Sequence, residues 1–299
     1  MNEPVFIGGF RSGSTLLINL LGLHSEIAPW FETKELCEAL RWLRVVHHPA
    51  VAAFETTLIQ PRAPAGFHLD AVVARMRWHV VQTCRRLSGE AASGKAGHET
   101  YPLGADWILY SQQEALAAIA CWHRAVARSA QVWNATGDWI RFLGQLQVER
   151  MGRRLWVNKT PEIPRFNPEL WRSLGPCRQI LLIRNGWEVV RSAVALGWGD
   201  VERLAWQWRK LIEESRRGAR PGYYLEVRYE HLVADPKATL DRIWAFLGLE
   251  SQSDNVLRRY QEKGARIVPP ACREPHDDLA ARYAFDRVAA GLMASLGYE

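Results

Sequence analysis

The chain has 299 residues, of which 48% are hydrophobic and 23% charged, so its composition is that of a folded globular domain and excludes a disordered or fibrous protein. The formal net charge of +6 is mild and spread along the chain, so we expect no nucleic-acid partner. No apolar run is long enough to cross a bilayer, and the first strand begins too early to leave room for a signal peptide, which predicts a cytoplasmic protein.

The first predicted element is a buried strand at residues 5–7, which leads through a glycine-rich turn into a helix. The turn, residues 8–15, has nearly the spacing of a nucleotide-binding P-loop, G-x-x-x-x-G-K-[ST]. Ser14 stands where the P-loop has lysine, and Arg11 supplies a cation inside the turn. Because free N–H groups and the helix dipole meet there, we expect an anion site that does not hold ATP. An ordinary Gly/Ser turn is the alternative.

Residues 36–154 predict a mainly helical insertion on the acceptor side, because they show helical periodicity. We expect helices at 71–87 and 112–128, separated by proline- or glycine-containing loops at 60–67 and 88–101. Many of the 14 tryptophans of the chain fall in or near this stretch. They are interpreted as buried core residues or, alternatively, as the lining of an aromatic acceptor pocket.

The remaining chain alternates short apolar runs with helical patterns. Three more strands are predicted, at residues 155–157, 179–183 and 223–227. A helix is expected to begin at Asp235-Pro236 and to end at Gly248, and a last helix to run from about 277 to 296. The pattern predicts one α/β domain over residues 1–299. Its fold is a P-loop-like, doubly wound parallel sheet flanked by helices, with the insertion after the first strand–helix unit.

Cysteine placement predicts no metal site. The five cysteines are widely separated, and none forms a Cys-x-x-Cys pair or a cluster with histidine. We therefore expect a reduced protein that needs no metal.

Four segments resemble, in order, the motifs of sulfotransferases that use 3′-phosphoadenosine 5′-phosphosulfate (PAPS). The turn from residue 9 to 16 resembles their 5′-phosphosulfate loop, in particular the form found in tyrosylprotein sulfotransferases, with Phe10 in place of a proline. The resemblance implies that five loop residues bind the donor: Arg11, Ser12, Gly13, Ser14 and Thr15.

The second and third segments supply further polar groups. Residues 183–192 resemble the 3′-phosphate motif of the family, which implies that Arg184 and Ser192 bind the 3′-phosphate, although Asn185 replaces the usual aspartate. An Asn-Lys-Thr-Pro element resembles the segment whose lysine touches the bridging oxygen of the donor. The resemblance gives that role to Lys159.

The fourth segment resembles a strand-to-helix unit of the family whose tyrosine, here Tyr229, lies near the adenine. Trp208 loosely matches a tryptophan of the nucleotide pocket. Lys263-Gly264 resembles a C-terminal element that covers the 3′-phosphate, although a solvated helix end is an equal alternative for this pair. The resemblance covers both flanks of the insertion but not the insertion itself.

The resemblance also supplies a candidate base. Glu32 stands as far beyond the loop as the catalytic glutamate of tyrosylprotein sulfotransferases, so the resemblance implies that Glu32 is the base. Together with Lys159 and Arg11 of the donor motifs, it completes the expected catalytic groups. Two aromatic residues before Glu32 are expected to desolvate its carboxylate partly. A glutamate that merely begins a helix is the alternative, with Glu35 as the reserve base. His24 is expected to cap the first helix.

Together these features predict a PAPS-dependent enzyme that transfers a sulfuryl group to an acceptor hydroxyl by in-line displacement. A small molecule, lipid or glycan is the favoured acceptor. A peptide tyrosine, bound in a groove rimmed by Arg41, Arg44 and Arg62, is the alternative. A P-loop kinase, which would need lysine at position 14, and a non-catalytic nucleotide-binding protein also stay open. The oligomeric state is not defined by the sequence.

Overall fold

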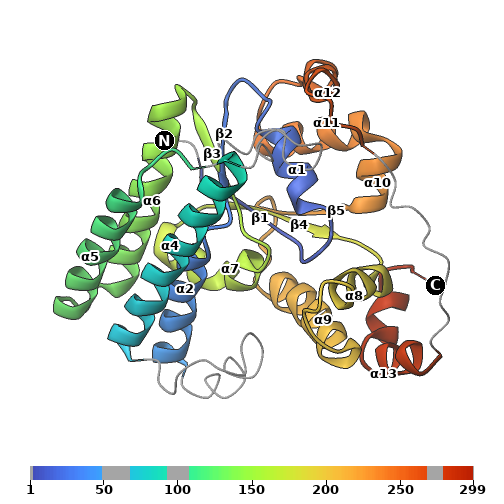
Figure 1. Cartoon of the computed structure of the whole chain (residues 1–299), viewed down its shortest axis with the longest axis horizontal. Coiled ribbons are helices and arrows are strands. Elements are labelled where there is room, and N and C mark those ends of the chain that lie inside the picture. The colour runs from blue at the N-terminus through green and yellow to red at the C-terminus, as the bar shows by residue number, and fades with distance from the viewer. Residues whose placement is uncertain (1–2, 49–67, 93–107, 268–278, 299) are drawn as a thin grey trace.

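The computed structural model describes residues 3–48, 68–92, 108–267 and 279–298. Its centre is a sheet of five parallel strands in the order β2-β3-β1-β4-β5, with helices on both faces (Figure 1). The strands are β1 (Val5–Gly8), β2 (Ile27–Phe31), β3 (Leu155–Lys159), β4 (Arg178–Ile183) and β5 (Tyr224–Arg228). The predicted α/β class and the four predicted strands are confirmed.

The strand β2 was not predicted, and its presence changes which element the insertion follows. Pro29 lies in this strand, and proline lowers the strand signal because it donates no ladder hydrogen bond. β2 pairs only with β3 and is an edge strand, where a missing donor on the open side is tolerated. The helical insertion therefore follows the second strand rather than the first strand–helix unit.

The helices form three groups around the sheet (Figure 1). The insertion side carries α2 (Lys34–His47), α4 (Leu69–Ala92), α5 (Gln112–Arg128), α6 (Val132–Met151), the 3-10 helix η3 (Ile163–Phe166) and α7 (Asn167–Leu174). A second group comprises α8 (Gly186–Val194), α9 (Val201–Arg217) and α13 (Leu279–Ser295). The third group comprises α1 (Ser14–Leu21), α10 (Tyr229–Ala234), α11 (Pro236–Leu247) and α12 (Ser253–Glu262).

Successive side chains of each strand point to opposite faces of the sheet, so they pack against different groups of helices. In β1, Phe6 packs in the core of the insertion side, whereas Val5 and Ile7 pack with α1 and α11. In β4, Leu181 and Ile183 pack with α8, α9 and α13. The sheet is thus buried on both faces, as a doubly wound parallel sheet requires.

Three described tryptophans of the insertion, Trp42, Trp122 and Trp139, belong to its core, whereas Trp78 is 55% exposed. Trp122 is 2% exposed and contacts Trp42 and Trp139 with ring centroids 5.8 and 5.7 Å apart, and its Nε1 donates to Thr136 Oγ1 at 2.9 Å. The predicted helices at 71–87 and 112–128 are present in α4 and α5.

One loop expectation in the insertion is wrong in part. Helix α4 continues through Gly89 to Ala92, where a loop was expected from residue 88. Residues 60–67 and the rest of the second expected loop, 93–101, lie outside the described residues. A single glycine costs a helix only about 1 kcal/mol, which does not end a helix of 24 residues.

No described helix is both long enough and apolar enough to span a membrane. No group of three or more His, Cys, Asp or Glu side chains is placed to hold a metal ion within the ranges given above.

Candidate active site

The carboxyl ends of the parallel strands meet a cavity of about 740 Å³. It is lined by the glycine turn after β1, by Glu32 after β2, by Lys159 at the end of β3, by Arg184 after β4 and by Tyr229 after β5. Ligands of open α/β sheets bind at this edge. Segments far apart in the sequence thereby form one site.

The glycine turn aims backbone N–H groups at the cavity. The N-cap of α1 is Gly13, which has a left-handed conformation with φ of 82°. A Cβ atom at this position would lie 2.3 Å from the Tyr229 ring, so only glycine fits. The first turn of α1 leaves its N–H groups without intrahelical acceptors, and the helix dipole adds positive potential there. The turn therefore has the geometry of an anion site.

The hydroxyl groups of the turn do two different things. Ser12 and Ser14 are buried, and their hydroxyls donate to backbone carbonyls of the same turn at 2.9 and 3.0 Å. Thr15 Oγ1 instead accepts from Lys159 Nζ at 3.2 Å. Ser14 and Thr15 line the cavity, whereas Ser12 lies behind it. The two serines hold the shape of the turn, and Thr15 joins the turn to Lys159.

Lys159 occupies the centre of the site. Its Nζ lies 3.0 Å from Glu32 Oε1 as well as 3.2 Å from Thr15 Oγ1. The side chain is 2% exposed, and Nζ lies 4.3 Å from the centroid of the Phe31 ring. Removal from water strengthens the attraction between the ammonium and the carboxylate. A cation, a hydroxyl and a carboxylate are thus held in one network facing the cavity.

Only one of the two aromatic residues before Glu32 lies near this network. Trp30 belongs to the core of the insertion side, where its Nε1 donates to Tyr110 Oη at 2.7 Å. Successive side chains of a strand point to opposite faces, so Trp30 and Phe31 diverge. Of the two rings, Phe31 is therefore the one placed at the network, where Lys159 contacts one oxygen of the Glu32 carboxylate, and partial desolvation of Glu32 stays a prediction.

Arg11 and Arg184 join the glycine turn to the motif after β4. Arg11 Nε and Nη2 donate to Ser192 Oγ at 3.1 and 3.0 Å. Arg184 Nη1 lies 3.5 Å from the Arg11 carbonyl oxygen, and its guanidinium carbon lies 4.9 Å from the Tyr229 ring centroid. Ser192 therefore reaches the site through Arg11, while both arginines line the cavity. The motifs that the sequence analysis connected only by resemblance are in direct contact.

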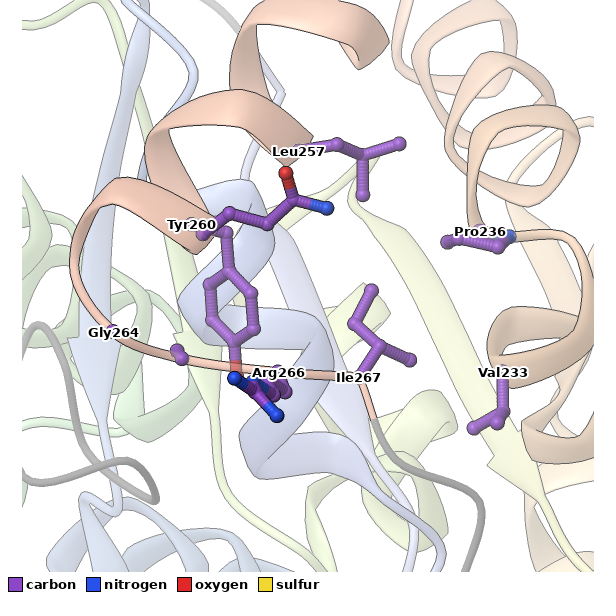
Figure 2. Close-up of a pocket in the computed structure, with 9 residues that line it drawn as sticks. Val233, Pro236, Leu257, Tyr260, Gly264, Arg266 and Ile267 are labelled. Atoms are coloured by element: carbon purple, nitrogen blue, oxygen red, sulfur yellow. The ribbon is translucent and has the colours of Figure 1, made fainter.

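Two expected nucleotide contacts lie away from this cavity. Trp208 is 1% exposed and packs behind the start of α8. Gly264 lines a second cavity of about 680 Å³, where Tyr260 and Leu257 face Val233 across a groove (Figure 2). The two cavities share no lining residue. Contact of a nucleotide with Trp208 or with Lys263-Gly264 therefore stays a prediction.

The reserve base and the histidine also lie outside the cavity. Glu35 is buried in α2, and burial raises its pKa to about 7. His24 follows α1, its backbone N–H donates to the Leu21 carbonyl, and its Nε2 lies 3.0 Å from the carbonyl oxygen of Glu250. Glu32 is thus the carboxylate that the fold places beside Lys159.

Sequence reasoning missed four cationic residues of the cavity wall. Arg203 and Lys210 lie seven residues apart on α9, with Gln207 between them at the four-residue spacing of one helix face. Lys34 begins α2, and Arg165 belongs to η3. The periodicity of α9 was visible in the sequence, but only the fold shows that this face meets the cavity.

Comparisons with solved structures show the fold of the chain in other proteins. The chain is similar to the sulfotransferase domain of the Synechococcus PCC 7002 olefin synthase, with a TM-score of 0.51 and 18% identity, over 100% of this chain and 97% of that one. It is also similar to the sulfotransferase STF9 from Mycobacterium avium, with a TM-score of 0.51 and 14% identity, over 100% and 78% of the two chains. Identities this low show the fold alone.

The sequence itself was compared with curated proteins and with family models. No curated protein sequence matches the chain. The model of the Sulfotransferase family matches residues 4–254, a range that contains the glycine turn, Glu32, Lys159, Arg184 and Tyr229. The match covers most of the chain and every segment that builds the cavity, so the chain belongs to the sulfotransferase family.

Proposed function

We propose that this protein transfers the sulfuryl group of PAPS to a hydroxyl group of an acceptor molecule. One observation carries the proposal: Lys159 Nζ bridges Thr15 of the glycine turn and the carboxylate of Glu32 at the cavity wall. A phosphosulfate-binding turn, a cation for the leaving group and a base for the acceptor are the three parts that such a transfer needs.

The residues present fit a PAPS molecule. The donor carries phosphate groups at its 5′ and 3′ positions, and the cavity offers N–H groups of the turn for one and Arg184 for the other. The Tyr229 ring, which contacts both Gly13 and Arg184, provides a flat apolar surface between them. PAPS supplies the sulfuryl group and a bisphosphate leaving group.

Lys159 and Arg11 are assigned to charge stabilisation. Both line the cavity beside the N-terminus of α1, where negative charge would develop on the leaving phosphate. Removing one preorganised donor of this kind raises the activation barrier by about 2.7–4 kcal/mol. Thr15 and the N–H groups of the first turn hold the same phosphate.

Glu32 is assigned to proton removal from the acceptor hydroxyl. Its side chain is 17% exposed, so it is reachable from the cavity, and Lys159 fixes one carboxylate oxygen at 3.0 Å. A carboxylate at the cavity wall can accept the proton of the acceptor hydroxyl. Glu35 does not line the cavity, which favours Glu32 for this role.

The burial of two arginines favours a small acceptor over a peptide tyrosine. The peptide alternative needs an open groove rimmed by arginines, but Arg41 and Arg44 are only 6% and 8% exposed. Arg41 pairs with Glu38 at 2.7 Å and Arg44 with Glu169 at 2.8 Å, so their charges serve the fold. Arg62 lies outside the described residues.

The donor assignment is tested with a pair of nucleotides that differ only in the 3′-phosphate. We expect adenosine 3′,5′-bisphosphate to bind the wild type at least tenfold more tightly than adenosine 5′-phosphate, as measured by calorimetry. In Arg184→Gln the bisphosphate should lose most of this advantage, because the lost contact is made to the 3′-phosphate alone. ATP with Mg²⁺ is the third titrant, and binding of ATP instead of the bisphosphate would favour the kinase alternative.

The base assignment is tested in the same protein by turnover. Glu32→Gln should lower the release of bisphosphate from PAPS, with a panel of phenols and alcohols as acceptors, by about 10²–10⁴-fold while binding of the bisphosphate stays within twofold. Glu213→Gln, an exposed substitution on α9 outside the cavity, is the matched control. Unchanged turnover in Glu32→Gln would contradict the role given to this residue.

A further inference from the structure

The cavity at the glycine turn carries more positive charge than the donor motifs supply. Seven lysine and arginine side chains line it, against two glutamates. Three of the seven, Arg11, Lys159 and Arg184, belong to the motifs assigned to the donor. The other four are Lys34, Arg165, Arg203 and Lys210.

Two of these four are paired with carboxylates of the protein itself. Arg165 Nε lies 2.6 Å from Glu214 Oε2, and Lys210 Nζ lies 3.4 Å from Glu214 Oε1. Three positive charges in fact surround this carboxylate, because Arg44 Nη1 lies 3.4 Å from it, and together they hold its pKa below the usual value. Glu162 adds a second carboxylate 3.8 Å from Arg165. These ion pairs join α9 to η3 and engage both cations within the protein.

Arg203 and Lys34 differ from that pair. Neither has a carboxylate partner among the residues that the structure describes. The Nε atom of Arg203 is buried, and none of the described residues supplies it with a hydrogen-bond acceptor. A buried donor without an acceptor is unfavourable and rare in folded proteins. An anion in the cavity would supply the acceptor that the protein does not.

The position of Arg203 in its helix adds to the local positive potential. It lies in the first turn of α9, where Asp200 caps the helix through the backbone N–H of Arg203 at 2.9 Å. The dipole of this 17-residue helix favours a negative charge at its N-terminus and disfavours a cation. Arg203 thus adds a cation at the positive end of the helix dipole, where Asp200 and Glu202 offset part of the potential, and an anion in the cavity would be attracted to it.

The same wall has an apolar side. The Trp198 ring is 51% exposed, lines the cavity and lies 5.8 Å from the Phe10 ring, centroid to centroid. Leu204 follows Arg203 in the chain and also lines the cavity. A ligand held by Arg203 can therefore place a ring or an alkyl chain against Trp198.

We propose, on the basis of the function proposed above, that the acceptor is an organic acid. It carries a carboxylate or phosphate group in addition to the hydroxyl that is sulfated. Arg203 and Lys34 bind the anionic group, and Trp198 packs against the apolar part of the molecule. The positive charges of Arg203 and Lys34, which the donor motifs do not include, make the acceptor site select acids over neutral hydroxyl compounds.

The test measures binding of matched acid and neutral probes to the protein loaded with adenosine 3′,5′-bisphosphate, at constant ionic strength. The pairs are 4-hydroxyphenylacetate and its methyl ester, 10-hydroxydecanoate and its methyl ester, and glycerol 3-phosphate and glycerol. We expect the acid to bind at least tenfold more tightly than its neutral partner in one pair or more. Arg203→Gln and Lys34→Gln should each reduce that ratio at least threefold, and Arg209→Gln, an exposed substitution on α9 outside the cavity, should keep it.

The two proposals fail in distinguishable ways. If the wild type does not bind the bisphosphate, the proposed donor site is wrong, and this inference is overturned with it. Tight bisphosphate binding together with equal affinity for acids and neutral partners, or with no binding of any acid, would overturn the inference alone. An acid preference that survives both Arg203→Gln and Lys34→Gln would also overturn it, because the preference would then arise elsewhere. Bisphosphate affinity within twofold of wild type in these variants separates the acceptor cations from the donor site.

Discussion

Two residues of the site hold a backbone conformation that glycine adopts more readily. Arg11 has φ of 49° and Glu32 has φ of 47°, and no other described non-glycine residue has a positive φ. For an L-residue this left-handed conformation costs about 1–2 kcal/mol, so it persists only where surrounding contacts fix it. In both cases the turn directs a charged side chain toward the cavity. Strain at these positions supports the roles proposed for Arg11 and Glu32.

The strain at Arg11 predicts a difference between two truncations. Arg11→Gly and Arg11→Ala both remove the guanidinium, but only glycine relieves the positive φ. We expect Arg11→Gly to have a free energy of unfolding about 1 kcal/mol higher than that of Arg11→Ala, as measured by urea denaturation. Both variants should bind adenosine 3′,5′-bisphosphate equally weakly. Equal stability of the two would show that the backbone at Arg11 is not strained.

Close packing at the level of elements depends on small residues in α6. A Cβ atom on Gly137 would lie 1.9 Å from the Ser173 carbonyl oxygen at the end of α7, and one on Gly144 would lie 2.4 Å from the Trp156 ring of β3. These contacts let α6 lie directly on the sheet and on α7. Gly291 in α13 is also helical but has no atom within 4 Å of its Cβ position, so it serves as a matched comparison.

Alanine substitutions at Gly137 and at Gly291 should have opposite effects on stability. Gly137→Ala should destabilise the fold by about 1–3 kcal/mol, because α6 and α7 must move apart. Gly291→Ala should stabilise it by up to about 1 kcal/mol, because alanine has the higher helix propensity and no clash follows. Thermal unfolding of the two variants measures the difference. A stabilising Gly137→Ala would show that the two helices are not fixed at this distance.

At the scale of the whole molecule, buried ionisable groups make stability depend on pH. Glu35 lies in α2 between the sheet and the insertion, where burial raises its pKa from 4.5 to about 7. The charges acting on Glu38 oppose this trend, because Arg41, Arg75 and His79 hold its pKa well below the usual range. Between pH 5 and 8 Glu38 is therefore mostly ionised in the folded and the unfolded chain alike and contributes little to the pH dependence, in contrast to Glu35.

The sign of the Glu35 effect follows from proton linkage. Between pH 4.5 and 7 the folded state holds a proton on Glu35 that the unfolded state has lost, so stability falls as pH rises. Glu35→Gln removes this penalty. Relative to wild type, the variant should gain about 3 kcal/mol in free energy of unfolding between pH 4 and pH 8, as measured by denaturant titration at each pH. A difference that does not change with pH would show that Glu35 ionises normally in the fold.

Much of the architecture could be predicted because its signals are local. The glycine turn, four apolar strands and the Asp235–Gly248 helix each depend on residues close together in sequence, and all are present. The edge strand β2 could not be predicted, because Pro29 hides the strand pattern and only pairing with β3 stabilises it. The motif residues Arg11, Lys159 and Arg184 do meet at one cavity, as their order in a parallel sheet requires.

The sequence by itself determined the α/β class, the glycine turn and the family to which the chain belongs, because these depend on short motifs in a fixed order. Only the tertiary structure decided that Glu32 pairs with Lys159 while Glu35 is buried, and that Arg203 of α9 faces the same cavity. The physical reason is that charge pairing and burial depend on distances between elements, and the helix–sheet packing sets these distances.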